Sequence, residues 1–419
     1  MAQLTDDCFA HGGALLPLDQ ALADLRQRLV PVTQSETLPL QDCLGRAVAL
    51  PVLAQVSVPP QANSAVDGYA VYFDDLNPDT ATTLPVVGRA AAGHPHAGLP
   101  PRGSAVRIFT GALMPQGMDT VLMQEDCSAT EAQVTIRPGI KRGANSRAAG
   151  EDIAAGQMAL APGTVLTPAH LALAAAVGHA DLPVYRPLRV ALLSTGDEVN
   201  PLGQPLPPGG IYDANRPMLA ALLRRLGCQV SDLGILPDKR AILAAKLAEA
   251  AAGHDAVISS GGVSTGEEDH VKAAIEMHGA LHLWRLAIKP GRPVALGQIG
   301  RVPYFGLPGN PVAALLTFAF FARPLLARLG GAELPPLRAF PVRAGFAYRK
   351  KPDRREWVRV ILEPGEPGGA WLARKYPVDG AGIITSLTGS DGILELEESR
   401  TRLEPGDSAR FYPYGLLGL

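Results

Sequence analysis

Apolar runs of strand length alternate with helical patterns over residues 185–330. Four such runs read LRVALLST, CQVSDLGIL, HDAVISS and VPYFGLP, and each precedes a segment whose apolar residues recur every three or four positions. Strands that are apolar along their length, alternating with helices, are typical of a mostly parallel sheet covered on both faces. This region is therefore predicted to be a doubly wound α/β domain.

The flanking regions have other patterns. A helix is predicted over residues 18–29, where leucines fall on one face, and a second short helix over residues 40–48. Short alternating runs punctuated by Gly and Pro predict a small β domain over residues 67–143. Helical spacing returns over residues 164–181, and strand patterns follow the linker GGAELPPLRAFP after residue 331. The chain is therefore expected to be an α/β multidomain protein.

Composition narrows the class of protein. Among 419 residues, Lys+Arg 38 and Asp+Glu 40 give a net charge of -2, without the basic excess typical of nucleic-acid binders. The Cys 4 are scattered with no CxxC pair, which favours reduced thiols and disfavours a zinc knuckle. No signal peptide is visible, and the longest apolar run, Val312–Ala322, is shorter than a membrane span. We expect a cytoplasmic protein with no nucleic-acid or membrane partner.

One predicted strand ends in SSGGVSTGEEDHVK, which combines a glycine-rich turn with three acids. Glycine backbone N–H groups approach phosphates closely, whereas carboxylates repel them unless a cation lies between. Mg²⁺ suits this role, because it binds one or two carboxylates together with phosphate oxygens. The alternative is a capped helix start, in which the acids complement the helix dipole. Glu267 and Glu268 fit that alternative, whereas Asp269 beside the glycines fits the metal role.

Three other stretches carry polar groups at the ends of predicted strands. STGDEV (194–199) offers oxygen ligands beside Gly196, although such turns are common. GLPGNPV (306–312) suits a helix start, with Asn310 as the N-cap and Pro311 next, and its extra glycines suggest an approaching anion. RLAIKPGRP gathers Arg285, Lys289 and Arg292 into either a solvated edge or an oxyanion pocket.

Together these stretches resemble the molybdopterin molybdenumtransferases, the molybdenum-inserting family of molybdenum cofactor biosynthesis that includes the E domain of gephyrin. The resemblance runs from about residue 15 to the C-terminus. The matching stretches, in the family's order, are SAVDGYAV, IFTGALMPQGMDTVL, RAAGEDI, STGDEV, YDANRPML, SSGGVSTGEEDHVK, AIKPGRP and GLPGNPV.

The resemblance implies four domains. They are a helical linker domain (1–54 and 149–184), an inserted β domain (55–148), an α/β molybdopterin-binding domain similar to the molybdopterin adenylyltransferases (185–330) and a C-terminal β-barrel (331–419). It also implies a Mg²⁺-dependent reaction in which adenylylated molybdopterin and molybdate give molybdenum cofactor and AMP. An elongated homodimer is implied, with each active site shared between subunits, and the adenylyltransferase is a possible partner.

The family's site residues carry over by motif. The implied catalytic residues are Asp67, Thr110, Asp152, Glu198 and Asp269. The implied metal ligands are Asp269, Asp238 and Glu198. The implied substrate-binding residues are Gly261, Gly262, Ser264, Gly266, Lys289, Arg292, Pro308, Asn310 and Arg354. Lys289 and Arg292 are the expected molybdate-facing pair, since two cations suit a small dianion.

Two departures from the family pattern affect the oxyanion site. Arg292 stands where the family often has a second lysine, which keeps the charge and changes the donor geometry. Ala381 stands where the family often has a serine, so that a contact to molybdate would fall to Ser386 or another group.

Two other functions remain open. An adenylyltransferase would need the α/β domain alone, and a gephyrin-like scaffold would need none of the acids or KPGRP. Tungstate could replace molybdate, since the two oxyanions are similar in size and charge.

Overall fold

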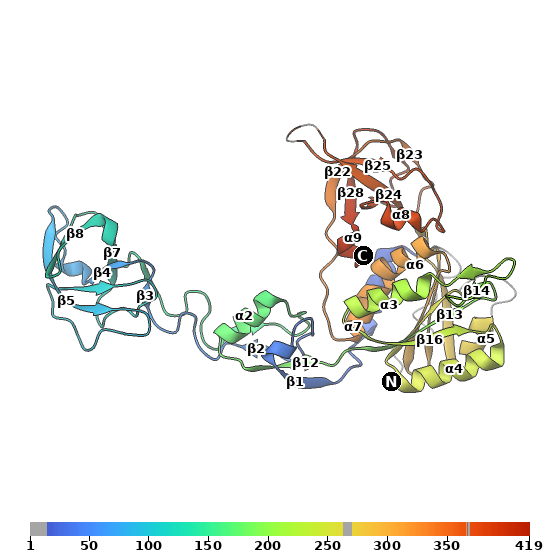
Figure 1. Ribbon diagram of the computed structural model, residues 1–419, viewed down its shortest axis with the longest axis horizontal. Helices are drawn as coiled ribbons and strands as arrows, with labels where there is room; N and C mark the ends of the chain where they lie inside the picture. Colours follow the sequence, from blue (N-terminus) through green and yellow to red (C-terminus); the bar gives the residue numbers. More distant parts are fainter. Residues whose placement is uncertain (1–14, 263–269, 366, 368) are drawn as a thin grey trace.

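The chain is elongated, with the β domain at one end and the α/β domain and barrel at the other (Figure 1). The computed structural model describes residues 15–262, 270–365, 367 and 369–419. Two extended arms run through the linker domain to the β domain, and the C-terminal barrel packs on the α/β domain. The four parts are therefore arranged in space as the multidomain fold class predicts.

The α/β domain is built on a six-stranded sheet in the order β16-β13-β17-β21-β20-β18. β16, β13, β17 and β21 are parallel, whereas β20 runs antiparallel to both of its neighbours. The strands are β13 (Arg189–Thr195), β16 (Gln229–Leu236), β17 (Ala256–Ser260), β18 (Gly279–Arg285), β20 (Pro293–Ile299) and β21 (Val302–Leu307). A short pair, β14 (Val199–Asn200) and β15 (Ile211–Tyr212), lies outside this sheet. The mostly parallel sheet is confirmed.

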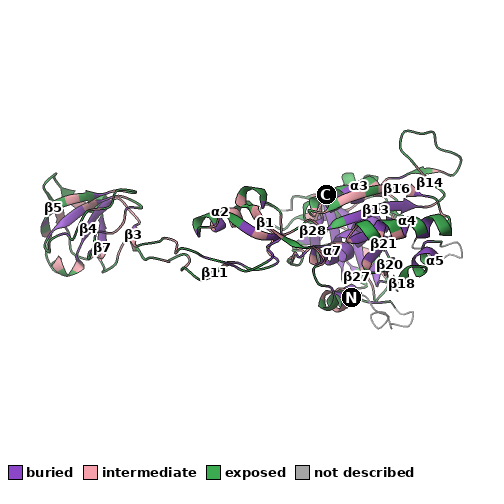
Figure 2. Ribbon diagram, turned by 90° about the horizontal axis from the view of Figure 1, so that it is seen from below, coloured by how far each residue is buried: buried purple, intermediate pink, exposed green. Residues whose placement is uncertain are grey.

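Helices cover both faces of this sheet, and alternate residues of each strand enter different cores. On β13, Val190 and Leu192 pack with α3 (Asn215–Arg225) and α6 (Pro311–Thr317), whereas Ala191 and Leu193 pack with α4 (Arg240–Gly253) and α5 (His270–Glu276). Both side-chain sets are buried because successive residues of a strand point to opposite faces. This explains why the strands are apolar along their length (Figure 2).

The longest apolar helix lies in the larger core. It comprises α6, a π-helical turn (Phe318–Ala322) and α7 (Arg323–Leu329). By length and composition alone, Pro311–Leu329 could cross a membrane, but 78% of its apolar window is buried inside the protein. Its packing against α1 (Leu18–Arg28) and α3 is that of a core helix.

The C-terminal domain is a closed five-stranded barrel in which β24 pairs with β26 to complete the ring β24-β25-β22-β28-β26. Its elements are β22 (Phe340–Ala344), β23 (Tyr348–Arg349), β24 (Arg355–Glu363), β25 (Leu372–Lys375), α8 (Thr385–Thr388), β26 (Gly392–Leu396), β27 (Arg402–Leu403), β28 (Ser408–Pro413) and α9 (Tyr414–Leu417). A short strand of the α/β domain, β19 (Ile288–Lys289), adds to β24 in parallel. This pairing fixes the barrel to the α/β domain.

The linker domain combines one helix with paired strands. β1 (Ser35–Pro39) pairs with β12 (Asp181–Tyr185), β2 (Val52–Leu53) pairs with β11 (Met158–Leu160), and α2 (Pro168–Ala176) packs over them. The helix predicted over residues 40–48 is wrong: only Leu40–Asp42 form a 3₁₀ turn. Ala47 and Val48 instead bridge to Val165 and Val184, so backbone pairing across the domain overrides the local spacing.

The predicted N-terminal helix is confirmed as α1, which shares its core with α7 in the α/β domain. The domain boundaries stay predictions.

The β domain is a six-stranded sheet in the order β7-β4-β6-β5-β9-β8. Its strands are β4 (Gly68–Val71), β5 (Thr82–Ala90), β6 (Ala105–Ile108), β7 (Thr120–Met123), β8 (Cys127–Ala129) and β9 (Gln133–Ile136). At its base β3 (Asn63–Ser64) pairs with β10 (Ser146–Arg147), which joins the two arms of the chain.

Candidate functional site

The carboxyl ends of β13, β17 and β21 lie side by side at one edge of the α/β sheet. From β13 the chain moves outward to β16 and then returns to β17 on the other side of β13. In open α/β sheets, ligands bind at such a reversal, outside the carboxyl ends of the strands. The glycine-rich turn that follows β17 begins at this point.

A cavity of about 330 Å³ opens at this edge. Three predicted site residues, Glu198, Gly261 and Asn310, line it together. They come from the turns after β13, β17 and β21 respectively, so the fold brings together three motifs that are far apart in sequence. Glu198 and Asn310 are exposed at the opening.

Three buried polar atoms at this cavity have no hydrogen-bond partner within the described part of the chain. They are the Ser194 Oγ, the Thr195 Oγ1 and the Asn215 Oδ1. A buried polar group left unpaired costs about 1–3 kcal/mol, so such atoms mark places where a ligand, water or ion completes the bonding. Their clustering at the strand ends indicates a site that binds a polar ligand.

Sequence reasoning missed the role of Asn215, at the start of α3. Its Nδ2 donates to the Ser260 Oγ at 2.8 Å and to the Gly309 backbone oxygen at 2.6 Å. The side chain therefore ties the end of β17 to the turn after β21. Its motif, YDANRPML, carries only the family resemblance, and the spacing of apolar residues around Asn215 does not predict the two hydrogen bonds.

The turn after β17 requires glycine. Gly261 has φ +86°, and a Cβ at that position would lie 2.5 Å from the Thr195 backbone oxygen. Gly262 has φ +65°, and its Cβ would meet the Val271 side chain at 2.4 Å. The backbone thus passes against the end of β13 without side chains, as in turns that approach phosphates. Ser264, Gly266 and Asp269 lie outside the described residues.

Oxygen donors at this edge fit Mg²⁺ in part. Glu198 offers an exposed carboxylate, and Asp238 follows the end of β16, next to β13 in the sheet. Within residues 15–262, 270–365, 367 and 369–419, no group of three or more His, Cys, Asp or Glu residues forms a complete metal site. Mg²⁺ commonly binds through one or two carboxylates and substrate phosphates, so a site that is completed by substrate agrees with these residues.

Lys289 and Arg354 meet on a buried carboxylate that sequence reasoning missed. The Glu356 side chain is 1% exposed and accepts from the Lys289 Nζ at 3.2 Å and from the Arg354 Nε at 2.6 Å. The Tyr348 hydroxyl donates to the same carboxylate at 3.0 Å. Burial acts against the charge on Lys289, but Tyr348 and Glu356 raise the pKa of its ammonium group. Lys289 therefore stays charged, and two predicted oxyanion residues share one carboxylate.

This basic cluster lies at the same sheet edge as the cavity. β20 begins at Pro293 and runs antiparallel to β21, so the KPGRP turn adjoins the carboxyl end of β21. Arg292 is exposed in that turn, and Pro308 is buried after β21. The Ala381 backbone oxygen of the barrel accepts from the Val312 N–H at 3.0 Å, which brings residues 380–382 against the start of α6.

The Ser386 hydroxyl is engaged within its own turn. The side chain is fully buried, and the hydroxyl donates to the Ile383 backbone oxygen at 2.5 Å. Of the two alternatives for the molybdate contact, this geometry favours another group over Ser386. Asn310 is the N-cap of α6, but its side chain makes no capping hydrogen bond.

Asp67 and Thr110 form a second polar site, in the β domain. The backbone N–H and the hydroxyl of Thr110 both donate to the Asp67 Oδ1 at 2.8 Å. These two bonds, with the charge of Arg107 nearby, hold the pKa of Asp67 below its ordinary value. Arg107 also stacks on Tyr69 and Phe109, with its Cζ 4.9 and 4.8 Å from the two ring centroids.

Within one chain, these β-domain residues and the cavity lie at opposite ends of the molecule (Figure 1). Asp152 is exposed on the arm between them, where its backbone N–H donates to the Val58 oxygen. The structure thus divides the predicted site residues into two sets.

Three family models match the chain in order. They are the MoeA N-terminal region (domain I and II) over residues 16–178, a probable molybdopterin binding domain over 191–328, and the MoeA C-terminal region (domain IV) over 341–414. The Haemophilus influenzae protein named molybdopterin molybdenumtransferase is 39% identical over 409 residues, covering 96% of this chain and 100% of that protein. The Nostoc protein of the same name is 39% identical over 333 residues, covering 77% of this chain and 76% of its own length.

Solved structures are also similar over the whole length. A molybdopterin biosynthesis MoeA protein from Pyrococcus horikoshii OT3 superposes with a TM-score of 0.80 at 26% identity, covering 96% of this chain and 100% of that one. A second P. horikoshii structure gives a TM-score of 0.75 at 31% identity, covering 96% and 99%.

Gly261→Ala should destabilise the protein more than Gly203→Ala. Both glycines have positive φ, which costs an L-residue roughly 1–2 kcal/mol, but the Cβ at position 203 would meet nothing within 4 Å. At position 261 the methyl group would also push against the Thr195 backbone oxygen. Urea unfolding of both variants measures the difference, and equal losses of stability would show that the turn has room for a side chain.

Thr110→Val should raise the pKa of Asp67 toward its ordinary value, because one of its two hydrogen bonds is lost. A lowered carboxyl pKa stabilises the fold above the ordinary pKa, and this stabilisation is lost as pH falls through the lowered value. In the variant this stabilisation should be smaller, and its loss should be complete at a higher pH. Carboxyl ¹³C NMR measures the titration, with Thr83→Val, which removes a Thr83–Thr135 hydroxyl contact elsewhere in the domain, as the control. An unchanged Asp67 titration would contradict the assignment.

Proposed function

Because the chain belongs to the molybdopterin molybdenumtransferases, and is therefore a molybdenum-transferring enzyme, we propose that it converts adenylylated molybdopterin and molybdate into molybdenum cofactor and AMP in the presence of Mg²⁺. The observation that carries the proposal is the cavity at the ends of β13, β17 and β21, with three unpaired buried polar atoms beside a glycine turn. We also propose that the protein is cytoplasmic and that a molybdopterin adenylyltransferase supplies its substrate.

The phosphates of the substrate would lie against the turn at Gly261 and Gly262. No side chain projects there, so backbone N–H groups can approach the anionic oxygens and hold the pyrophosphate in one orientation. Glu198, Asp238 and, from sequence alone, Asp269 would hold Mg²⁺. The ion would neutralise charge that develops on the phosphate oxygens when AMP leaves.

Molybdate would bind beside the Lys289–Glu356–Arg354 cluster. The two cations offer charge-assisted hydrogen bonds, and the Arg354 fork suits an oxyanion. Arg292 adds a third positive charge in the exposed turn. Because this cluster adjoins the same sheet edge as the cavity, both substrates would meet there.

A shared active site in a homodimer would give Asp67 and Thr110 a role. They lie at the far end of the chain from the cavity, so a second copy would have to bring its β domain to the first copy's sheet edge. The two bonds from Thr110 support this role, since they hold the Asp67 carboxylate in one orientation.

AMP release from adenylylated molybdopterin should require molybdate and Mg²⁺. Lys289→Ala should raise the half-saturating molybdate concentration roughly ten- to hundredfold, the equivalent of a lost charge-assisted bond of about 1.5–3 kcal/mol. Lys246→Ala, which removes an exposed lysine on α4, is the control.

Three results would count against this proposal. Adenylylation of molybdopterin from ATP would favour the adenylyltransferase, and a lack of both reactions would favour a scaffold. If Lys289→Ala loses affinity only for adenylylated molybdopterin, Lys289 contacts the phosphates and not molybdate.

Mixed subunits test the shared site. An Asp67→Asn chain and a Glu198→Gln chain should each lose AMP release as homodimers. In a mixed dimer one site collects both substitutions and the other collects neither, so that activity should return to about half of wild type in that species. If exchange is confirmed by mass spectrometry and activity stays absent, each site belongs to one chain and Asp67 is a structural residue.

A further inference from the structure

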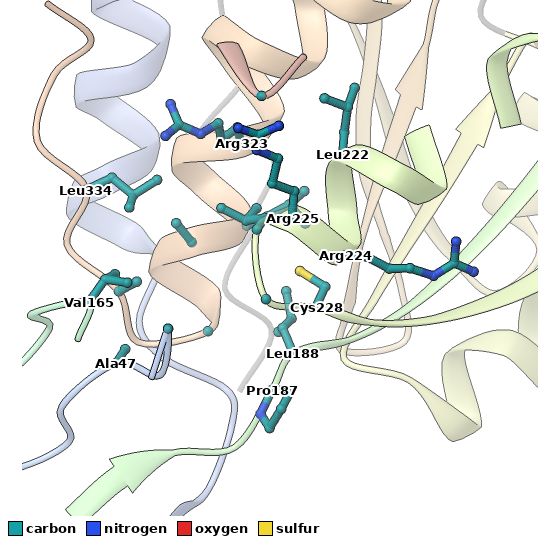
Figure 3. A pocket seen from close by; sticks show the side chains of 18 of the residues that line it. Ala47, Val165, Pro187, Leu188, Leu222, Arg224, Arg225, Cys228, Arg323 and Leu334 are labelled. Atoms are coloured by element: carbon teal, nitrogen blue, oxygen red, sulfur yellow. The ribbon is translucent and has the colours of Figure 1, made fainter. Parts of the chain in front are cut away.

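A larger cavity, of about 510 Å³, lies at the junction of the linker domain, the α/β domain and the C-terminal segment (Figure 3). Its wall includes residues 44–47 and 185–188, the end of α3, the helix from 318 to 330, and residues 415–418. None of the predicted site residues lines it. It is therefore separate from the candidate active site.

Three arginines that line this cavity, Arg224, Arg225 and Arg323, make no side-chain ion pair or hydrogen bond within the described structure. In Figure 3 the side chains of Arg225, at the end of α3, and Arg323, at the start of α7, lie at one end of the cavity, whereas Arg224 extends away from them. Arg46 and Arg186 in the same wall are different, since both pair with Glu36 at 2.6 and 3.5 Å. Arg46 and Arg186 thus share one carboxylate, whereas Arg225 and Arg323 have none.

Local backbone geometry brings Arg323 to this position. Pro324 has no N–H, and the helix takes a π-helical turn just before it, with the Arg323 N–H bonded to the Phe318 oxygen. The Arg323 side chain is half-buried, and this burial lowers the pKa of its guanidinium group. Burying a charge without a partner is costly, and a bound anion removes that cost.

The rest of the wall is mostly apolar. It is formed by Val165, Leu188, Leu222, Phe318, Leu326 and Leu334. A ligand with an anionic head at the arginines and an apolar body would match both parts of the cavity. An arginine fork binds a carboxylate through two parallel hydrogen bonds, whereas the apolar wall gains from burial of hydrocarbon.

We propose that this three-domain cavity binds a small organic carboxylate, whose head group is held by Arg225 and Arg323 and whose apolar body lies against the leucine-rich wall. Bound there, the ligand would contact the linker segment, α3, α7 and the C-terminal segment together. It would therefore stabilise one orientation of the linker arm relative to the α/β domain.

Octanoate is the probe. Octanol tests the apolar chain without a charge, and inorganic phosphate tests an anion without an apolar chain. Isothermal titration of the full chain should show saturable octanoate binding, at least tenfold tighter than the binding of octanol or phosphate. Arg323→Gln and Arg225→Gln should each weaken it roughly ten- to hundredfold, the effect of removing one charge-assisted bond. Arg224→Gln is the matched control, since Arg224 is the neighbouring arginine and extends away from the other two in Figure 3.

Each other result overturns the proposal. Equal binding of octanol would show that the arginines are irrelevant, and equal weakening by Arg224→Gln would show unspecific attraction to positive charge. A second copy of the chain covering the cavity would exclude octanoate from the wild type. If Arg323→Gln fails to fold by circular dichroism, the exposed Arg225→Gln still decides the question, and Arg323→Lys should retain part of the affinity.

Discussion

The Glu356 carboxylate holds the C-terminal barrel and the α/β domain together. It is buried on β24 of the barrel, and the Lys289 ammonium group reaches it from β19 of the α/β domain. Removing Glu356 would leave Lys289 and Arg354 close together without their shared carboxylate, whereas removing Lys289 would leave Glu356 paired with Arg354. The parallel pairing of β19 with β24 brings the two residues into register, so backbone and side chain fix the same arrangement. The basic turn, the barrel loop at residues 380–382 and the start of α6 meet there because these contacts position the barrel on the α/β domain.

The sequence predicted those features that depend on local periodicity. Continuous apolar runs located the strands of the α/β sheet, and the alternation of strand and helix implied that their carboxyl ends share one edge, which is why Glu198, Gly261 and Asn310 line one cavity. Residues 40–48 show the limit. Their apolar spacing fits a helix turn, but pairing of Ala47 and Val48 with strands more than 100 positions away overrides it.

Features that depend on contacts between distant segments could not be predicted. Glu356 is 67 positions from Lys289, and it lies among the apolar residues of a barrel strand, where nothing local indicates a shared carboxylate. Asn215 had the appearance of an ordinary helix start, whereas its amide joins two strand ends. For Ser386 the family pattern left open whether its hydroxyl is available, and the fold uses that hydroxyl within its own turn.

The balance of charges differs between the basic cluster at the sheet edge and the three-domain cavity. At the sheet edge, Glu356 neutralises one of the charges of Lys289 and Arg354, so the cations can be held close together without a ligand and one positive charge remains for an incoming oxyanion. An oxyanion that binds there would compete with the Glu356 carboxylate for the same donors, which favours its release. Arg225 and Arg323 have no such carboxylate in the described structure, so an anion that binds between them competes only with water. The same residue types would therefore hold the proposed oxyanion substrate at the sheet edge less tightly than the proposed carboxylate in the three-domain cavity.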